Sequence, residues 1–306
     1  MPAILLDTFL KTAAGPDLGK VIFTIARAGK YVAHALRNGD LGKSGLENPS
    51  GENQLALDIL ADKIFCDHLR STGLVAVFAS EEQNGEVAVS PDGKFSVAFD
   101  PLDGSSLVDS NLAIGAIFAI YRGAGFLGKT GREMAAAGYL IFGPRTKFVF
   151  ATENGIWEFT ENAIGEFTLS KEKIELLPDA KIFAPGNLRA LAERPEYEKL
   201  FLELAKTPLT LRYSGGMVPD IHLAFSKSSG IFLYPSHSKY PNGKLRLLYE
   251  CAVFAFLAKA AGGAALDENG AEILDKKITK LHERTTFIVG SKNTVFRAVE
   301  ILRGEK

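Results

Sequence analysis

The chain has 306 residues, of which 46% are hydrophobic and 23% are charged, as is typical of a globular protein with one large or two packed domains. Its 35 basic and 36 acidic residues give a net charge of −1, which argues against binding to nucleic acid or to a membrane surface through bulk charge. The two cysteines form no CxxC pair, no apolar run is long enough to span a membrane, and the N-terminus lacks a secretory pattern, so we expect a cytoplasmic protein with reduced thiols.

The N-terminal half begins with helical patterns and continues with buried strands. An apolar stripe predicts a helix over Asp17–Leu36, which Asn38-Gly39 ends. Residues 39–53 are polar and rich in glycine, as in a loop, and Gln54–Arg70 predicts a second helix. Apolar runs then predict strands at Leu74–Ala79, Phe95–Phe99, Ile114–Tyr121 and, as turning strands, across Phe148–Leu169.

The composition changes near residue 178, and we expect a domain boundary there, with domains of residues 1–178 and 179–306. Strands and helices alternate beyond it, which predicts a layered α/β or α+β enzyme. The predicted strands are Lys181–Ala184, Thr210–Tyr213, Ile231–Tyr234 and Thr285–Gly290, and the predicted helices are Arg189–Lys206, Val218–Ser226, Leu247–Ala261 and a last one after Gly290.

The segment from Asp100 to Ser106 carries the strongest chemical signal. Asp100 and Asp103 lie three residues apart after a buried strand, so both carboxylates can face one cation. Gly104, Ser105 and Ser106 follow, and their unobstructed backbone N–H groups suit a phosphate. The alternative interpretation is that the two aspartates only form the turn.

A second acidic pair, Glu81 and Glu82, follows the preceding predicted strand. Ligands of open α/β sheets bind beyond the carboxyl ends of the strands, which indicates one shared site. Clustered carboxylates need a counter-charge, because a like-charged pair 4 Å apart costs about 4 kcal/mol at an effective dielectric near 20. An all-oxygen ligand set favours Mg²⁺, with Mn²⁺ as the alternative. The alternative interpretation is that Glu81 and Glu82 belong to a solvated loop.

Glu250 stands in an apolar helical run and therefore needs a cation. The candidates are Arg246, four residues earlier, and a metal ion. The turn Pro241-Asn242-Gly243 places Lys244 and Arg246 at the start of that helix, where an anion binds favourably. Cations here and acids elsewhere indicate a substrate with a phosphate at each end.

These segments together resemble the class I fructose-1,6-bisphosphatases over most of the chain. The motifs that carry the resemblance are Ser80-Glu81-Glu82, Phe99–Ser106, Gly230–Pro235 and Gly243–Glu250. Other segments are similar to the sedoheptulose-1,7-bisphosphatase branch, namely Gly143–Thr146, Pro185–Ala190 and Leu211–Asp220. The resemblance implies the layered α-β-α-β-α sugar-phosphatase sandwich, usually as a homodimer or homotetramer.

The resemblance also implies roles for individual residues. Two or three Mg²⁺ ions per subunit would be held by Glu81, Glu82, Asp100, the Leu102 carbonyl, Asp103 and Glu250, with Asp58 as a further metal-site acid. The reacting phosphate would lie against Asp103, Gly104, Ser105 and Ser106. The distal phosphate would be held by Asn187, Tyr213, Tyr234 and Lys244, and by Arg212 of a neighbouring subunit. Arg246 would lie near the 1-phosphate and the sugar.

Three departures from the family pattern stand out. Where the family has a further water-activating acid, this chain has Lys63 with Asp62 beside it. A tyrosine of the distal-phosphate site is replaced by Ala190. The AMP-binding segment also diverges, because Phe95 stands in place of a tyrosine, so we do not expect inhibition by AMP.

We therefore predict a Mg²⁺-dependent enzyme that removes the 1-phosphate of fructose 1,6-bisphosphate. Glu82 would position or deprotonate the attacking water, assisted by Asp58 or Asp62. The nearest alternative is a sedoheptulose-1,7-bisphosphatase or an enzyme that accepts both sugars. An inositol-monophosphatase-like enzyme fits less well, because Lys244, Tyr213 and Tyr234 imply a second phosphate. A non-catalytic sugar-phosphate sensor would have no need for so many clustered acids.

Overall fold

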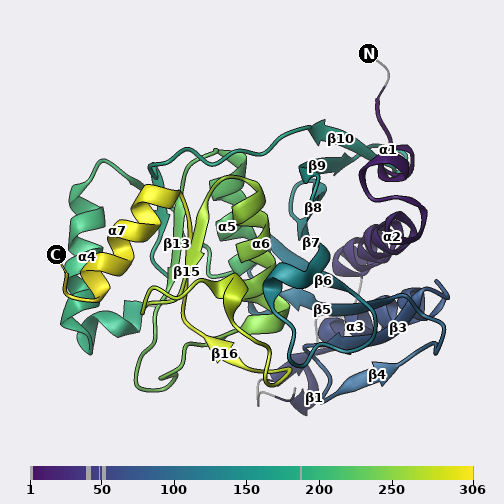
Figure 1. Ribbon diagram of the computed structural model, residues 1–306, viewed down its shortest axis with the longest axis horizontal. Coiled ribbons are helices and arrows are strands. Elements are labelled where there is room, and N and C mark those ends of the chain that lie inside the picture. Colours follow the sequence, from purple (N-terminus) through teal and green to yellow (C-terminus); the bar gives the residue numbers. More distant parts are fainter. Residues whose placement is uncertain (1–2, 39–42, 48, 50–52, 187, 306) are drawn as a thin grey trace.

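The protein, described here as a computed structural model, consists of five layers of helices and sheets (Figure 1). The structure describes residues 3–38, 43–47, 49, 53–186 and 188–305. Helices cover both outer faces of two sheets, and a further helical layer lies between the sheets. The predicted α-β-α-β-α sandwich is therefore confirmed. The helices are α1 (Leu6–Ala13), α2 (Pro16–Asn38), α3 (Ala56–Arg70), α4 (Pro195–Lys206), α5 (Met217–Ser226), α6 (Ala252–Ala260) and α7 (Lys292–Leu302).

The large sheet has eight strands in the order β10-β9-β8-β7-β6-β5-β3-β4, and only β3 and β5 pair in parallel. Its strands are β3 (Val75–Ser80), β4 (Glu86–Ala88), β5 (Phe95–Asp103), β6 (Ile114–Arg122), β7 (Met134–Phe142), β8 (Thr146–Thr152), β9 (Gly155–Glu161) and β10 (Phe167–Lys171). All nine residues of β5 are buried, because α3 packs on one face of the sheet and the middle layer packs on the other. The sequence of a strand that is covered on both faces is typically a continuous run of apolar residues.

The small sheet has five strands in the order β12-β11-β13-β17-β15. Its first three strands are parallel, so their carboxyl ends lie at one edge. Helices α4 and α7 cover its outer face, and α5 and α6 lie between it and the large sheet. The strands are β11 (Ile182–Ala184), β12 (Thr210–Leu211), β13 (Ile231–Tyr234), β15 (Ala264–Leu266) and β17 (Phe287–Gly290).

Shorter elements complete the fold. Two small antiparallel pairs are β1 (Lys43–Glu47) with β2 (Asn53–Leu55), and β14 (Leu245–Arg246) with β16 (Arg284–Thr285). A π-helix, η4 (Leu247–Cys251), precedes α6. The remaining single turns are η1 (Ser105–Leu107), η2 (Gly131–Glu133), η3 (Leu188–Ala192) and η5 (Ile273–Asp275).

Most of the predicted helices and strands are present, but α1, β7 and β15 were not predicted, and the helix predicted over Arg189–Lys206 is divided into η3 and α4, which begins at Pro195. Strand β5 continues to Asp103, four residues beyond the predicted end. Strand β7, which no prediction covered, begins Met-Ala-Ala-Ala, a sequence with higher helix than strand propensity, and packing between β6 and β8 overrides that preference. The predicted loop over residues 39–53 contains strand β1; residues 39–42, 48 and 50–52 lie outside the described part of the chain.

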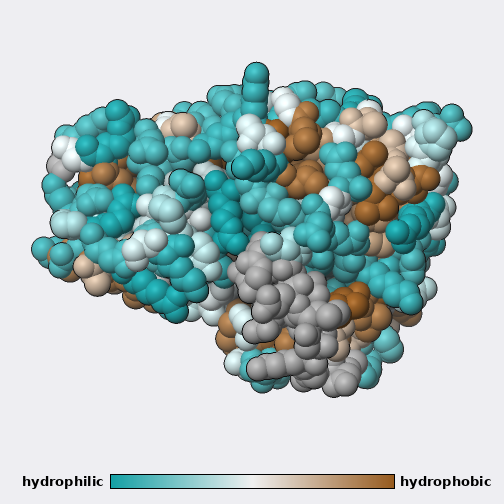
Figure 2. Space-filling model, turned by 90° about the horizontal axis from the view of Figure 1, so that it is seen from below, coloured by the Kyte–Doolittle hydropathy of each residue, from teal (hydrophilic) through white to brown (hydrophobic). Residues whose placement is uncertain are grey.

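The surface seen from below is mainly hydrophilic, and its apolar residues lie in separate patches (Figure 2). Among the helices of the described ranges, none is both long and apolar enough to cross a membrane.

Helix α5 approaches the large sheet very closely at Gly115 of β6. A Cβ atom built on Gly115 would lie 2.4 Å from a methyl carbon of Val218, near the start of α5. Gly115 pairs with Asp103 across the β5–β6 ladder, and the backbone N–H of Val218 donates to the Asp103 carboxylate at 2.7 Å. The absence of a side chain at residue 115 therefore lets α5 reach Asp103.

Substituting Gly115→Ala should move α5 away from the sheet and lower the free energy of unfolding by about 1–3 kcal/mol. Urea denaturation measures this change. The matched control is Gly143→Ala, whose added Cβ would meet its nearest neighbour, the Cβ of Ala113, at 3.5 Å, an ordinary contact. Equal stability of the two variants would show that the close approach of α5 to β6 does not constrain the fold.

Candidate active site

The acidic residues of the candidate site lie at the ends of two adjacent strands. Strands β3 and β5 are parallel neighbours, and Ser80 pairs with Phe99 at their ends. The backbone N–H of Glu81 donates to the Phe99 carbonyl at 3.0 Å. Glu81 therefore leaves β3 beside Asp100 of β5, as the sequence predicts.

The end of β5 directs two carboxylates into one region. The β5–β6 register shifts between Asp100 and Asp103, so the strand is irregular across Pro101-Leu102. An Asp100 carboxylate oxygen accepts the Leu102 N–H at 2.9 Å, which fixes this bend. Gly104 then adopts a φ of +81°, which glycine takes readily, and starts the η1 turn that carries Ser105 and Ser106.

These residues line a cavity of about 340 Å³ between the two sheets. Most of the predicted site residues lie on its wall: Asp58, Glu81, Glu82, Asp100, Leu102, Asp103, Gly104, Ser105, Ser106, Tyr213, Tyr234, Lys244, Arg246 and Glu250. Gly215, Met217, Phe232 and Leu245 also line it; sequence analysis did not single them out, because their apolar or small side chains give no chemical signal. The structure thus brings residues from both halves of the chain into one site.

The carboxylates repel one another in this buried position. Burial raises the pKa of Asp100 well above its usual value, and the charges of Glu81, Asp103 and Glu250 raise it further. Burial also raises the pKa of Asp103 to about 7, although the Val218 N–H lowers it. The site is therefore short of positive charge.

Arg246 supplies part of the missing charge. Its side chain is buried, and its Nη1 lies 2.9 Å from a Glu81 carboxylate oxygen and 3.7 Å from one of Glu250. The Arg246 backbone N–H also donates to Glu250 at 2.6 Å. Of the two candidate cations for Glu250, the structure thus shows the arginine in place, and Arg246 contacts Glu81 as well.

The donor atoms on the acidic wall suit a hard metal ion. They are carboxylate oxygens and the Leu102 carbonyl, the ligand type that Mg²⁺ and Mn²⁺ prefer. Within the described ranges, no three Asp, Glu, His or Cys side chains already converge as a formed metal site; Arg246 instead bridges Glu81 and Glu250. The chemistry of the donor set fits a divalent cation.

The two candidate water-activating aspartates on α3 point in different directions. Asp58, in the first turn of the helix, is buried, lines the cavity and accepts the Leu55 N–H at 2.7 Å. Asp62, one turn later, does not line the cavity and accepts the side-chain amide of Gln83 at 2.7 Å. Burial raises the pKa of Asp62 above its ordinary value. Lys63 is exposed.

The other end of the cavity carries phenols and a lysine. Tyr213 follows β12 and Tyr234 ends β13, so both lie at the edge where the parallel strands of the small sheet finish. Burial, with a contribution from Tyr234, raises the pKa of Tyr213 to about 12. Lys244 lowers the pKa of Tyr234 against the effect of burial, which indicates that the ammonium lies near this phenol.

The distal end has three further candidate residues, of which the structure describes two. Arg212 is exposed, donates to the Leu211 carbonyl at 2.9 Å and does not line the cavity. Asn187 lies outside the described residues. Arg189 lies near both phenols, since its charge lowers the pKa of each against the effect of burial. Sequence analysis did not select Arg189, although its position two residues after Asn187 could have indicated a role at the distal end.

Comparisons with known proteins agree with this arrangement. Residues 3–172 match the family model of the fructose-1,6-bisphosphatase N-terminal domain, and residues 176–303 match that of the C-terminal domain. A class 1 fructose-1,6-bisphosphatase of Trichlorobacter lovleyi is 46% identical over 94% of this chain and 91% of its own length. The chloroplastic sedoheptulose-1,7-bisphosphatase of Triticum aestivum is 40% identical over 98% of this chain and 77% of its own length.

A solved structure shows the same fold. The crystal structure of Leishmania major fructose-1,6-bisphosphatase superposes with a TM-score of 0.91, is 30% identical and covers 99% of this chain and 100% of its own. Both family models, the level of identity and the full-length superposition lead to one conclusion: this chain belongs to the fructose-1,6-bisphosphatase family, a family of metal-dependent phosphatases.

Proposed function

We propose that this chain hydrolyses the 1-phosphate of fructose 1,6-bisphosphate with Mg²⁺, giving fructose 6-phosphate and inorganic phosphate. The observation that carries the proposal is one cavity with two unlike ends. Buried carboxylates of β5, of η4 and of the turn after β3 form one end, and Tyr213, Tyr234 and Lys244 form the other. A sugar with a phosphate at each end fits this division, because one phosphate can bind metal ions while the other meets phenols and an ammonium group.

The acidic end would hold the reacting phosphate. Phosphate monoesters hydrolyse extremely slowly in water, so the enzyme must supply a very large reduction of the barrier. Bound Mg²⁺, on Glu81, Glu82, Asp100, the Leu102 carbonyl, Asp103 and Glu250, would supply Lewis-acid stabilisation of phosphate charge and an activated water.

The chain's other groups act on the phosphate and on the water. Ser105 and Ser106 offer backbone N–H groups and hydroxyls to the phosphate oxygens, and Gly104 lets the chain approach closely. Arg246, on the cavity wall, would lie near the 1-phosphate and the sugar. Glu82 positions the attacking water and accepts its proton, with Asp58 beside it. Asp62 holds Gln83 and thereby the turn that follows β3.

The second candidate substrate is sedoheptulose 1,7-bisphosphate. The 40% identical wheat relative carries that name, and the two sugars are alike at the reacting end. Discrimination then depends on the distal end; Ala190, which replaces a tyrosine of that site by the family resemblance, is buried in the core of the small-sheet half and does not line the cavity. The ratio of kcat/KM values for the two bisphosphates decides between the candidates.

We also infer a homodimer or homotetramer in which Arg212 reaches the distal phosphate of a neighbouring subunit. Its exposed side chain outside the cavity of its own chain supports this role. The meeting point of the two matched family models supports the division into two domains near residue 178. Two buried free thiols, Cys66 and Cys251, support a location in the cytoplasm.

The proposal is tested by phosphate release from fructose 1,6-bisphosphate. EDTA should abolish turnover and added Mg²⁺ should restore it, since the clustered carboxylates need a divalent cation. Asp103→Asn should lower kcat about 100-fold or more, because it removes a metal ligand. The exposed Asp109→Asn is the control for loss of one negative charge near the same segment. Full turnover in EDTA, or an unchanged Asp103→Asn variant, would refute the mechanism.

The water-activating group is tested by comparing Asp58→Asn with Asp62→Asn. Asparagine retains an acceptor oxygen for the Leu55 N–H or the Gln83 amide, so both variants should fold. We expect Asp58→Asn to lower kcat about 100-fold and to alter the acidic limb of the pH profile, and Asp62→Asn to lower kcat less than about tenfold. A larger loss of kcat in Asp62→Asn than in Asp58→Asn would assign the water-activating role to Asp62.

The distal phosphate site is tested with Lys244→Ala. Loss of one charge-assisted contact of about 1.5–3 kcal/mol should lower kcat/KM for fructose 1,6-bisphosphate about 10- to 100-fold. Turnover of fructose 1-phosphate, which lacks the distal phosphate, should change little. Lys181→Ala removes an exposed lysine elsewhere and serves as the control. Equal losses for both sugars would place Lys244 at the reacting end instead.

A further inference from the structure

A second and larger cavity lies beside the cavity of about 340 Å³ described above, which we call the catalytic pocket. The proposed reaction does not use this second cavity. It has a volume of about 640 Å³ and is lined by residues of the loop 239–243, the turn 267–269 and the segment 276–286. This is within the range of small-molecule sites. No residue lines both this second cavity and the catalytic pocket, so the two are separate sites.

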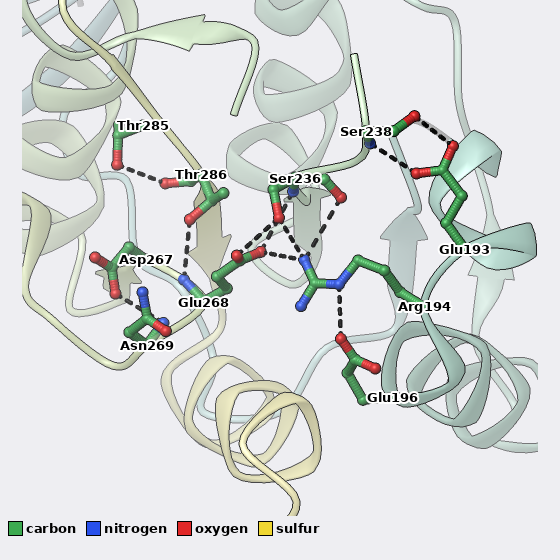
Figure 3. A network of polar contacts seen from close by, with 10 residues as sticks. All are labelled: Glu193, Arg194, Glu196, Ser236, Ser238, Asp267, Glu268, Asn269, Thr285 and Thr286. Atoms are coloured by element: carbon green, nitrogen blue, oxygen red, sulfur yellow. Dashed lines mark hydrogen bonds and ion pairs between the residues drawn. The ribbon is translucent and has the colours of Figure 1, made fainter. Parts of the chain in front are cut away.

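Two carboxylates of the second cavity already pair with cations. Asp267 pairs with Lys276 at 2.7 Å. The Glu268 side chain points toward Arg194, which does not line the cavity. One Glu268 carboxylate oxygen lies 2.6 Å from Nη1 of Arg194, and the other accepts the Ser236 hydroxyl at 2.8 Å (Figure 3). Asp267 therefore adds no uncompensated negative charge to the cavity, and Arg194 compensates Glu268 in part, because it also pairs with Glu196 at 2.7 Å.

Three further cations line the same cavity. Lys239 and Arg284 lie 5.5 Å and 5.0 Å from the centre of the Tyr240 ring, and Lys280 is exposed. Among the described residues, none of the three forms an ion pair. The remaining carboxylate, Glu283, is held by two hydrogen bonds of 2.9 Å from Thr279. The cavity thus has an excess of positive charge, although the whole chain carries −1.

We propose that the second cavity is an anion-binding site that takes a small molecule carrying two phosphate groups. Three cations around one concave wall can meet more than one phosphate, and ammonium and guanidinium groups bind phosphate through charge-assisted hydrogen bonds. Thr285 and Thr286 also line this wall, but the Thr285 hydroxyl already donates to the Thr286 carbonyl at 3.1 Å and the Thr286 hydroxyl accepts the Glu268 N–H at 3.1 Å, so the cations carry the argument. A molecule with one phosphate could meet only some of these three cations.

The site lies directly behind the strand that leads to the catalytic cations. Strand β16 pairs with β14, with Arg284 opposite Arg246. The Arg284 guanidinium donates to the carbonyl of Lys244 at 2.9 Å. A phosphate that binds Arg284 therefore contacts a side chain that is hydrogen-bonded to the backbone of Lys244, a residue of the catalytic pocket. This connection makes the site suitable for an effector rather than for a second substrate.

Calorimetric titration with inorganic pyrophosphate, without metal, tests the proposal. The double variant Lys239→Glu/Lys280→Glu should lose one pyrophosphate site per chain, or bind there at least about tenfold more weakly, because two charge-assisted contacts become repulsive. The control Lys181→Glu/Lys292→Glu makes the same charge change at two exposed lysines elsewhere and should retain wild-type binding. Melting temperatures confirm that both variants fold.

Repeating the titration in Lys244→Ala separates the second cavity from the catalytic pocket. The loss caused by Lys239→Glu/Lys280→Glu should persist in that background, even if the proposed distal phosphate site is wrong. Identical binding in the wild type and both double variants would overturn the proposal. A change in subunit number without loss of a pyrophosphate site would also overturn it, since the cavity would then be a contact between copies of the chain.

Discussion

The burial of several carboxylates at one point is the constraint on which the rest of the structure depends. Parallel pairing of β3 with β5 brings Glu81 beside Asp100, and the irregular end of β5 turns Asp103 to the same side. Such a cluster is unfavourable without compensation. Backbone N–H groups of Leu102 and Val218 and the guanidinium of Arg246 provide it.

This compensation requires both halves of the chain. Val218 belongs to α5 and Arg246 to β14, while the carboxylates they contact belong to the large sheet, except for Glu250. Tyr213 lies five residues before Val218 and Lys244 two residues before Arg246, and both line the opposite end of the catalytic pocket. Electrostatic compensation at the acidic end therefore also fixes the distance between the two ends, which is the property a bisphosphate site needs.

Sequence patterns predicted features that depend on residues close together in the chain. They did not predict contacts that arise only from tertiary packing. The end of β3 was predictable because its apolar run stops at Ser80 and Glu81, whereas β5 continues four residues beyond the end of its apolar run. Spacing of i and i+4 indicated that Arg246 meets Glu250, but its contact with Glu81, 165 positions away, arises only from the fold. Likewise Asp58 and Asp62 lie one turn apart on α3, and only the packing of this helix places the first in the cavity and the second against Gln83.

The position of Arg246 bears on why a metal ion is still needed. A guanidinium carries one positive charge, and Arg246 already shares it between Glu81 and Glu250. Even so, Glu81, Asp103 and Glu250 still raise the pKa of Asp100, so Arg246 compensates only part of the cluster. A divalent cation adds two charges where carboxylate oxygens dominate, and it would leave Arg246 available to an incoming phosphate. The arginine is thus best understood as a partner of the metal ion in balancing these acids, and not as its replacement.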